Sequence, residues 1–224
     1  MALKLAVIAS GNGSNLQAIL DRISDGALQA EVCLVLSNRP GAYALERARA
    51  AGVPALALDH TTYADRESFD HAMVAALQQA GAELIVLAGY MRLLTPVFLA
   101  AFPGRVVNIH PALLPSFPGV RGAQDAQHWG VKITGCTVHF VDEEMDHGAV
   151  IAQVAVPALP GEPLEDLAAR IHAMEHRIYP QVLQWIASGR VHMNGRDVHV
   201  GPATVAAAPV DGAWLAHPPL EQGF

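Results

Sequence analysis

The sequence predicts an α/β fold in which a mostly parallel, twisted sheet carries helices on both faces. Short apolar runs rich in β-branched residues alternate with amphipathic helical patterns along the first half of the chain. The first apolar run leads through a glycine-rich turn directly into a helical pattern. Hydrophobic residues make up 52% of the 224 residues and charged residues 16%, which is enough apolar surface for a packed core. Such alternation requires right-handed crossovers and places ligand sites at the carboxyl ends of the strands.

The first half of the chain supplies this alternation in a Rossmann-like order. Each expected strand is a short apolar run, and each expected helix spaces its apolar residues by three or four positions. The strands are expected at residues 3–9, 32–36, 53–58, 83–88 and 105–109. The helices are expected at about 14–25, 41–51, 63–80 and 94–101.

The pattern changes in the second half of the chain. Two extended segments, 132–142 and 149–156, are joined by a short polar loop and predict a hairpin on the sheet. A near-continuous apolar stripe predicts a helix over about 162–188 that covers the core. We expect a single domain over residues 1–195. The tail, 196–224, has weak periodicity, so we expect short strands or loose coil there and assign it no function.

Composition and charge exclude several classes of protein. The net charge is −7, with only 14 Lys and Arg and no basic run, which argues against a nucleic-acid partner. The longest apolar stretch, 84–107, is interrupted by arginines and prolines, which argues against a membrane span. Cys33 and Cys136 lie far apart and have no metal-binding spacing. We therefore expect a cytoplasmic protein with reduced cysteines and no metal.

The glycine-rich turn Ser10-Gly11-Asn12-Gly13-Ser14-Asn15 predicts an anion site. Glycines let the backbone approach a ligand, and the N-terminus of the following helix directs N–H groups toward it. Leu16 stands where a dinucleotide fingerprint has its third glycine, and Ser37-Asn38-Arg39 lacks a ribose-binding acid, so a monophosphate is favoured. One alternative is a plain strand-to-helix turn capped by Ser14 or Asn15. Another is a flavodoxin-like or nucleotide-binding module that senses a phosphorylated metabolite without chemistry.

A second polar group lies at the end of the strand predicted at 105–109. The strand period of two puts Asn108 and His110 on one face, and Pro111 favours an extended backbone at His110. Asp146, in the hairpin loop, carries a carboxylate that could orient the His110 ring and favour its charged form. The alternatives are an ordinary hydrogen-bonded turn for the pair and a solvated turn acid for Asp146.

Together these motifs resemble the phosphoribosylglycinamide formyltransferases over about residues 3–190. The resemblance rests on the glycine turn and on Leu87-Ala88-Gly89-Tyr90-Met91-Arg92, Asn108-Ile109-His110-Pro111-Ala112-Leu113-Leu114-Pro115 and Thr137-Val138-His139-Phe140-Val141-Asp142. A wider set of formyltetrahydrofolate enzymes shares the Asn-x-His element, including methionyl-tRNA formyltransferase and formyltetrahydrofolate deformylase. The resemblance implies a formyltransferase fold and transfer of the formyl group of 10-formyltetrahydrofolate to glycinamide ribonucleotide in purine biosynthesis. A deformylase-like hydrolase and the non-catalytic module remain alternatives.

The resemblance also implies binding residues. Glu175 would contact the ribosyl or glycyl part of the substrate, and Arg66 the glutamyl tail of the folate. The Met145-Asp146 loop would lie near the pterin. The phosphate would be held by Gly13, Ser14 and Asn15, and the folate by Met91, Arg92, Leu94 and Asn108. The alternatives are ordinary: a solvated helix face for Glu175, core packing for Met91 and Leu94, and a surface ion pair for Arg66.

The catalytic hypothesis assigns the chemistry to Asn108, His110 and Asp146. An uncharged amine attacks the formyl carbon, and the oxygen that becomes negative needs hydrogen-bond donors. Protonated His110 and the Asn108 amide would bind this oxygen, while Asp146 supports the imidazolium and, with a water, helps to move a proton to the folate nitrogen. Thr137 and His139 would surround this group or serve structure alone. We expect small-molecule substrates and a monomer or homodimer.

Three departures from the family pattern bear on affinity. The usual His-x-His after Pro118-Gly119 is replaced by Val120-Arg121-Gly122-Ala123-Gln124-Asp125. The usual Asp-x-Gly-Pro is Asp146-His147-Gly148-Ala149, and His172 stands where the family often has Lys or Gln. These departures concern substrate contacts and leave the three catalytic candidates in place.

Overall fold

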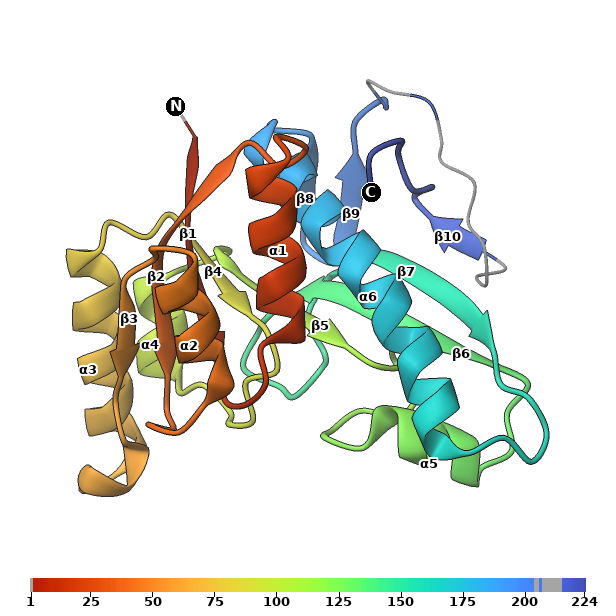
Figure 1. Cartoon of the computed structure of the whole chain (residues 1–224), viewed down its shortest axis with the longest axis horizontal. Coiled ribbons are helices and arrows are strands. Elements are labelled where there is room, and N and C mark those ends of the chain that lie inside the picture. The colour runs from red at the N-terminus through yellow and green to blue at the C-terminus, as the bar shows by residue number, and fades with distance from the viewer. Residues whose placement is uncertain (1, 204–205, 207–214) are drawn as a thin grey trace. The chain divides into compact units, whose positions relative to one another are not determined.

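The computed structural model describes residues 2–203, 206 and 215–224 (Figure 1). The chain forms two compact units, Met1–Asn108 and Ile109–Phe224. Among the described residues, no helix is both long and apolar enough to cross a membrane.

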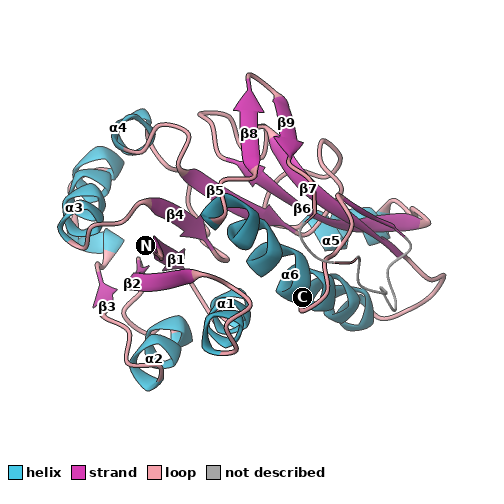
Figure 2. Cartoon of the chain, turned by 90° about the horizontal axis from the view of Figure 1, so that it is seen from above, coloured by secondary structure: helices cyan, strands magenta, loops and turns pink. Residues whose placement is uncertain are grey.

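The first unit is a parallel sheet with strand order β5-β4-β1-β2-β3. Helices α1 and α2 lie on one side of these strands, and α3 and α4 lie on the other (Figure 2). The middle strands are buried on both faces, as a parallel sheet between two helix layers requires. The elements are β1 (Leu3–Ala9), α1 (Ser14–Ser24), β2 (Ala30–Ser37), α2 (Tyr43–Ala50), β3 (Ala55–Ala57), the 3₁₀ turn η1 (His60–Thr62), α3 (Arg66–Gln79), β4 (Leu84–Leu87), α4 (Pro96–Ala101) and β5 (Val106–His110).

The second unit is an antiparallel arrangement covered by one long helix. Strand β7 pairs with β6 on one side and with β10 on the other, and β8 and β9 form a separate hairpin. Helix α6 packs on β6, β7 and α5 through an apolar face that includes Leu167, Ile171 and Ile178. The elements are α5 (Gly122–His128), β6 (Ile133–Phe140), β7 (Val150–Pro157), α6 (Leu164–Ala187), β8 (Val191–Asn194), β9 (Asp197–Val200) and β10 (Leu215–His217).

The predicted fold class, α/β with a mostly parallel sheet, is confirmed, and local signals explain where some helices begin. The helix expected from residue 63 begins at Arg66, because Asp65 and Ser68 form a capping box. The Asp65 carboxylate accepts from the Ser68 N–H, and the Ser68 hydroxyl accepts from the Asp65 N–H. The helix expected from residue 94 begins at Pro96, which suits the first helical position.

Three elements were not predicted: α5, η1 and β8. Helix α5 is short, and only Gly122 and Ala126 are buried on it, so its sequence has no apolar stripe. The tail was predicted as short strands or loose coil, and β9 and β10 agree with short strands. The part of that prediction that concerns residues 204–205 and 207–214 lies outside the described residues.

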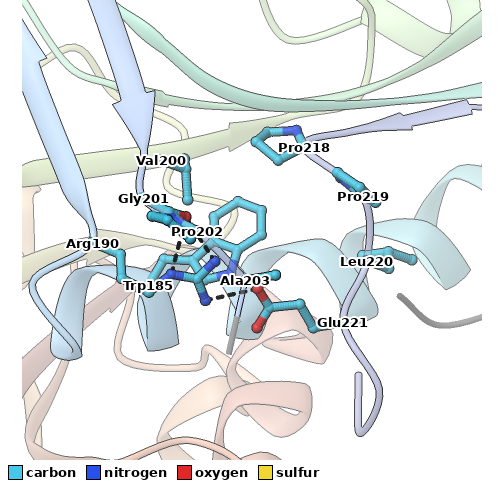
Figure 3. Close-up of a pocket in the computed structure, with 10 residues that line it drawn as sticks. All are labelled: Trp185, Arg190, Val200, Gly201, Pro202, Ala203, Pro218, Pro219, Leu220 and Glu221. Atoms are coloured by element: carbon cyan, nitrogen blue, oxygen red, sulfur yellow. Dashed lines mark hydrogen bonds and ion pairs between the residues drawn. The ribbon is translucent and has the colours of Figure 1, made fainter. Parts of the chain in front are cut away.

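The last described residues pack on the end of α6 through a buried ion pair. Arg190 Nη1 lies 2.7 Å from Glu221 Oε1, with 12% and 6% of the two side chains exposed. Arg190 also donates to the Gly201 carbonyl and lies over the Trp185 ring, and these residues line a pocket (Figure 3). Further along α6, Gln181 accepts from the Glu221 N–H. Gly201 and Glu221 are therefore held near the end of α6 by an ion pair and by backbone hydrogen bonds.

Arg190→Met is expected to lower the free energy of unfolding by about 3–5 kcal/mol, because it leaves the Glu221 carboxylate buried without its cation. Urea or thermal unfolding measures the loss. The control is Arg49→Met, which removes an exposed pair with Glu46 and should cost less than about 1 kcal/mol. Equal stabilities of the two variants would contradict the importance of the buried pair.

Candidate active site

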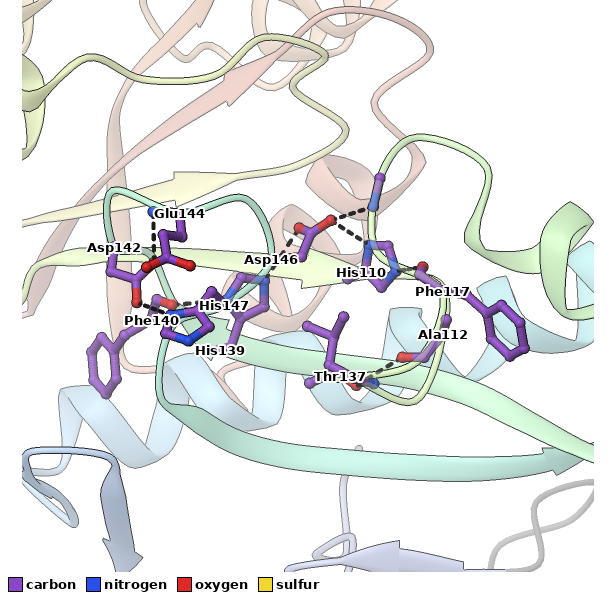
Figure 4. Close-up of polar contacts among 12 residues, drawn as sticks. His110, Ala112, Phe117, Thr137, His139, Phe140, Asp142, Glu144, Asp146 and His147 are labelled. Atoms are coloured by element: carbon purple, nitrogen blue, oxygen red, sulfur yellow. Dashed lines mark hydrogen bonds and ion pairs between the residues drawn. The ribbon is translucent and has the colours of Figure 1, made fainter.

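The His110 ring lies between two acceptors at the end of β5. Its Nε2–H donates to the Phe117 carbonyl at 2.8 Å, and its Nδ1 faces Asp146 Oδ2 at 3.4 Å (Figure 4). Only 3% of His110 is exposed. Each ring nitrogen of His110 therefore faces one oxygen of the surrounding chain.

Asp146 is held in place by a backbone hydrogen bond. Its Oδ2 accepts from the Gly119 N–H at 2.7 Å, and its side chain is 12% exposed. Its φ of 52° lies in the left-handed region, where Asp and Asn are better tolerated than most residues. The alternative of a solvated turn acid is therefore wrong, because the carboxylate faces a buried imidazole.

His139 lies on the other side of the same carboxylate. Its Nδ1–H donates to the Phe140 carbonyl at 2.8 Å, and its Nε2 is 3.9 Å from Asp146 Oδ1. Burial is the main cause that lowers the pKa of His139, which favours the neutral ring. Asp146 therefore lies between two buried imidazoles, those of His110 and His139.

Thr137 fixes the chain that follows His110. Its hydroxyl donates to the Ala112 carbonyl at 2.7 Å and accepts from the Leu114 N–H at 3.1 Å. Gln153 also donates to this hydroxyl at 3.0 Å. The structural interpretation of Thr137 is thereby supported, since its contacts position backbone.

Sequence reasoning missed the backbone groups that surround the pair. Phe117 and Gly119 act through a carbonyl and an N–H, and such contacts have no side-chain signature. Gly122 approaches the ring itself, because a Cβ there would lie 2.9 Å from His110 Nε2 and 3.2 Å from Cε1. The only signal available in the sequence was the Pro118-Gly119 pair, which is typical of a turn. In the structure Gly119 has a φ of 97°.

Gly122→Ala is expected to lower kcat by roughly ten- to a hundredfold, because the new methyl group must push the His110 ring from its two acceptors. Steady-state kinetics and the melting temperature are compared with those of Gly41→Ala, whose Cβ meets nothing within 4 Å. Wild-type kcat in a folded Gly122→Ala protein would contradict the assigned ring position.

The glycine turn of the first unit ends in the N-cap of α1. That N-cap residue is Gly13, which has a φ of 76°, and no described side chain caps the helix there. The alternative in which Ser14 or Asn15 caps α1 is therefore wrong. The first N–H groups of a helix have no acceptor within the helix, and the first turn of α1 carries no acidic residue. This helix end is suited to an anion.

The residues assigned to the folate also lie in the first unit. Met91 is 52% exposed, so core packing does not account for it. The Arg92 guanidinium lies 5.4 Å from the centre of the Phe69 ring. Arg66 donates to the Leu93 carbonyl at 2.7 Å, so its described contact is with backbone and not with an acid. Leu94 is half-buried.

Glu175 and Asn108 also depart from ordinary surface positions. Glu175 is 3% exposed on α6, so the alternative of a solvated helix face is wrong. Burial first, and the charge of Glu175 second, raise the pKa of the Cys136 thiol. Asn108 is half-buried on β5 and pairs in register with Leu87. Within the described ranges no three His, Cys, Asp or Glu side chains gather as a metal site.

Comparison with known proteins identifies the family. The family model described as formyl transferase matches residues 3–183, so the chain belongs to the formyl transferase family. Within it, the chain belongs with the phosphoribosylglycinamide formyltransferases: that of Escherichia coli strain K12 is 41% identical over 192 residues, which are 86% of this chain and 91% of the relative. The resemblance found in the sequence is thereby confirmed.

Solved structures and longer relatives agree. A glycinamide ribonucleotide transformylase from Symbiobacterium toebii matches with a TM-score of 0.88 and 49% identity, over 90% of this chain and 95% of its own. The Drosophila melanogaster trifunctional purine biosynthetic protein adenosine-3 is 46% identical over 188 residues. This chain spans only 14% of the length of that protein.

Proposed function

We propose that this chain transfers the formyl group of 10-formyltetrahydrofolate to the amine of glycinamide ribonucleotide, giving formylglycinamide ribonucleotide and tetrahydrofolate. The observation that carries the proposal is the buried His110 ring, 3.4 Å from Asp146, in a chain of this family. The names of relatives that match nearly along their whole length support the choice of substrate.

The reaction needs no covalent enzyme intermediate. The neutral amine attacks the formyl carbon, and the formyl oxygen becomes an oxyanion stabilised by Asn108 and by the His110 imidazolium. Asp146 balances the imidazolium charge. The amine then loses a proton and the folate nitrogen gains one as the bond between carbon and folate nitrogen breaks, with Asp146 and a water assisting the transfer.

The described contacts place one requirement on this mechanism. The Phe117 carbonyl takes the Nε2–H of His110, and Asp146 faces the other ring nitrogen. For His110 to donate to the oxyanion, the formyl oxygen must replace the Phe117 carbonyl at Nε2. Such an exchange swaps a neutral acceptor for a negative one, which strengthens the hydrogen bond as the intermediate forms.

The other site residues are assigned to binding one of the two substrates. Gly13, Ser14 and Asn15 hold the substrate phosphate, and Glu175 contacts its ribosyl or glycyl part. Met91, Arg92, Leu94 and Asn108 contact the folate, and Arg66 its glutamyl tail. We place the enzyme in the cytoplasm, as one formyltransferase domain over residues 1–195 with a tail over 196–224, acting as a monomer or homodimer.

The test is formyl transfer itself. The protein is mixed with 10-formyltetrahydrofolate, with and without glycinamide ribonucleotide, and folate absorbance and the formylated product are followed. We expect the formyl group to be lost only with the acceptor, with one product formed for each formyl group. Loss without acceptor would support a deformylase-like hydrolase instead. Acceptor binding without any loss of the formyl group would support a non-catalytic module.

A further inference from the structure

Arg47 on α2 hydrogen-bonds to the glycine turn. Its Nε donates to the Asn12 carbonyl at 2.9 Å, and its Nη2 donates to Asn12 Oδ1 at 2.9 Å. Its Nη1 donates to Gln17 Oε1 on α1 at 3.0 Å. The guanidinium also lies 4.9 Å from the centre of the Tyr43 ring. One half-buried side chain thus joins the turn, α1 and α2.

These contacts fix the direction in which the turn presents its N–H groups. The Gly11 carbonyl accepts from the Ala44 N–H at 3.1 Å, and the Asn12 carbonyl accepts from Arg47. In a trans peptide the N–H points opposite to the C=O. With both carbonyls directed at α2, the N–H groups of Asn12 and Gly13 point away from it, where they are open to an anion.

The turn needs this support because part of it is exposed and because glycines leave its backbone free to adopt several conformations. Gly11 and Asn12 are exposed, and Gly13 has a φ of 76°. The Cα of Ala44 packs so closely on Gly13 that a Cβ there would be only 2.9 Å from it. An exposed turn without such contacts would sample several conformations, and the entropy lost in ordering it would weaken the binding of a ligand.

The charge of Arg47 is not balanced by a carboxylate among the described residues. Its described contacts are with two side-chain amides, one backbone carbonyl and one aromatic ring. The neighbouring Arg49 differs, because it is exposed and pairs with Glu46. The two arginines on one helix therefore form a matched pair, one directed at the turn and one directed at solvent.

We propose that Arg47 is the positioning residue of the phosphate site, holding the glycine turn so that its N–H groups are preorganised for the substrate phosphate. The inference rests on the proposed function, and it concerns the acceptor and not the folate. Arg47 acts through its two hydrogen bonds to Asn12, which we call the two-point hold, and it adds a positive charge behind the turn.

The test compares Arg47→Met with Arg49→Met. Arg47→Met is expected to raise KM for glycinamide ribonucleotide by roughly ten- to a hundredfold, the effect of losing charged hydrogen bonds, with KM for formylfolate within about twofold of wild type. Arg49→Met should match wild type in both. Stabilisation of the melting temperature by inorganic phosphate should be retained by Arg49→Met and reduced in Arg47→Met.

Two further variants separate positioning from charge and from helix stability. Arg47→Lys keeps the charge but has a single donor group, so it should restore only part of the affinity. Asn12→Ala leaves α2 intact and should raise the same KM, and its effect should not add to that of Arg47→Met. Full recovery in Arg47→Lys, or additive effects, would overturn the two-point hold.

The outcomes also separate this inference from the proposed function. If wild type uses the phosphorylated acceptor and Gly13→Val raises its KM while Arg47→Met does not, the role of Arg47 is refuted and the phosphate site stands. If wild type gains no stability from inorganic phosphate and turns over no phosphorylated acceptor, both are refuted.

Discussion

Replacing Asp146 by asparagine is expected to lower kcat by roughly 10²- to 10⁴-fold, the usual contribution of a positioned acid or base. The substitution removes the carboxylate charge that faces His110 Nδ1 at 3.4 Å, which the proposed mechanism uses to balance the charge on the ring. Asparagine keeps the size of the side chain and an oxygen that can accept from the Gly119 N–H. It also tolerates the left-handed backbone at this position, so the fold should survive.

The measurement is single-turnover formyl transfer, with KM for both substrates determined in parallel. Asp142→Asn is the matched control, because Asp142 lies in the same loop and its Oδ2 contacts the exposed His147 ring at 3.0 Å. It should keep kcat within about threefold of wild type. An Asp146→Asn protein with wild-type turnover would end the role assigned to the carboxylate.

Gly13→Val is expected to raise KM for glycinamide ribonucleotide by roughly a hundredfold or more, with a smaller effect on kcat. The new Cβ would lie 2.8 Å from Ala44 Cβ, and a β-branched residue is strained at a φ of 76°. The turn must therefore move away from α2, and the N–H groups at the start of α1 lose their alignment on the phosphate.

Backbone strain alone must be separated from damage to the site. Gly26→Val provides the control, since Gly26 has a φ of 80° at the other end of α1 but meets nothing within 4 Å. Both variants should lose stability in thermal unfolding, and only Gly13→Val should lose affinity for the acceptor. A similar KM in the two variants would refute the phosphate role of the turn.

Apolar periodicity predicted the strands of the first unit, the hairpin and α6, because those elements bury one or both faces and the core dictates their residues. The contact between His110 and Asp146 was a hypothesis that left a solvated turn acid open for Asp146, and the structure confirms the contact. Short η1 and α5 were missed because neither buries a stripe of side chains.

The remaining parts of the site were not predictable for a different reason. The carbonyl of Phe117 and the N–H of Gly119 act through the main chain, and any residue type supplies those groups. Arg47 was missed because a charged residue on a short helix resembles any solvated helix face. Its importance depends on where the turn of the preceding βα unit passes, which is a tertiary property.

The short strand β10 limits how copies of this chain can associate. It pairs with β7 over Leu215–His217, so that stretch of β7 already has hydrogen-bonded neighbours on both sides. Unpaired strand edges invite a second chain to extend the sheet, and a strand contributed by the tail blocks this route. A homodimer that continued the sheet at this stretch of β7 would first have to displace residues 215–217, whereas one built on helices or loops would not.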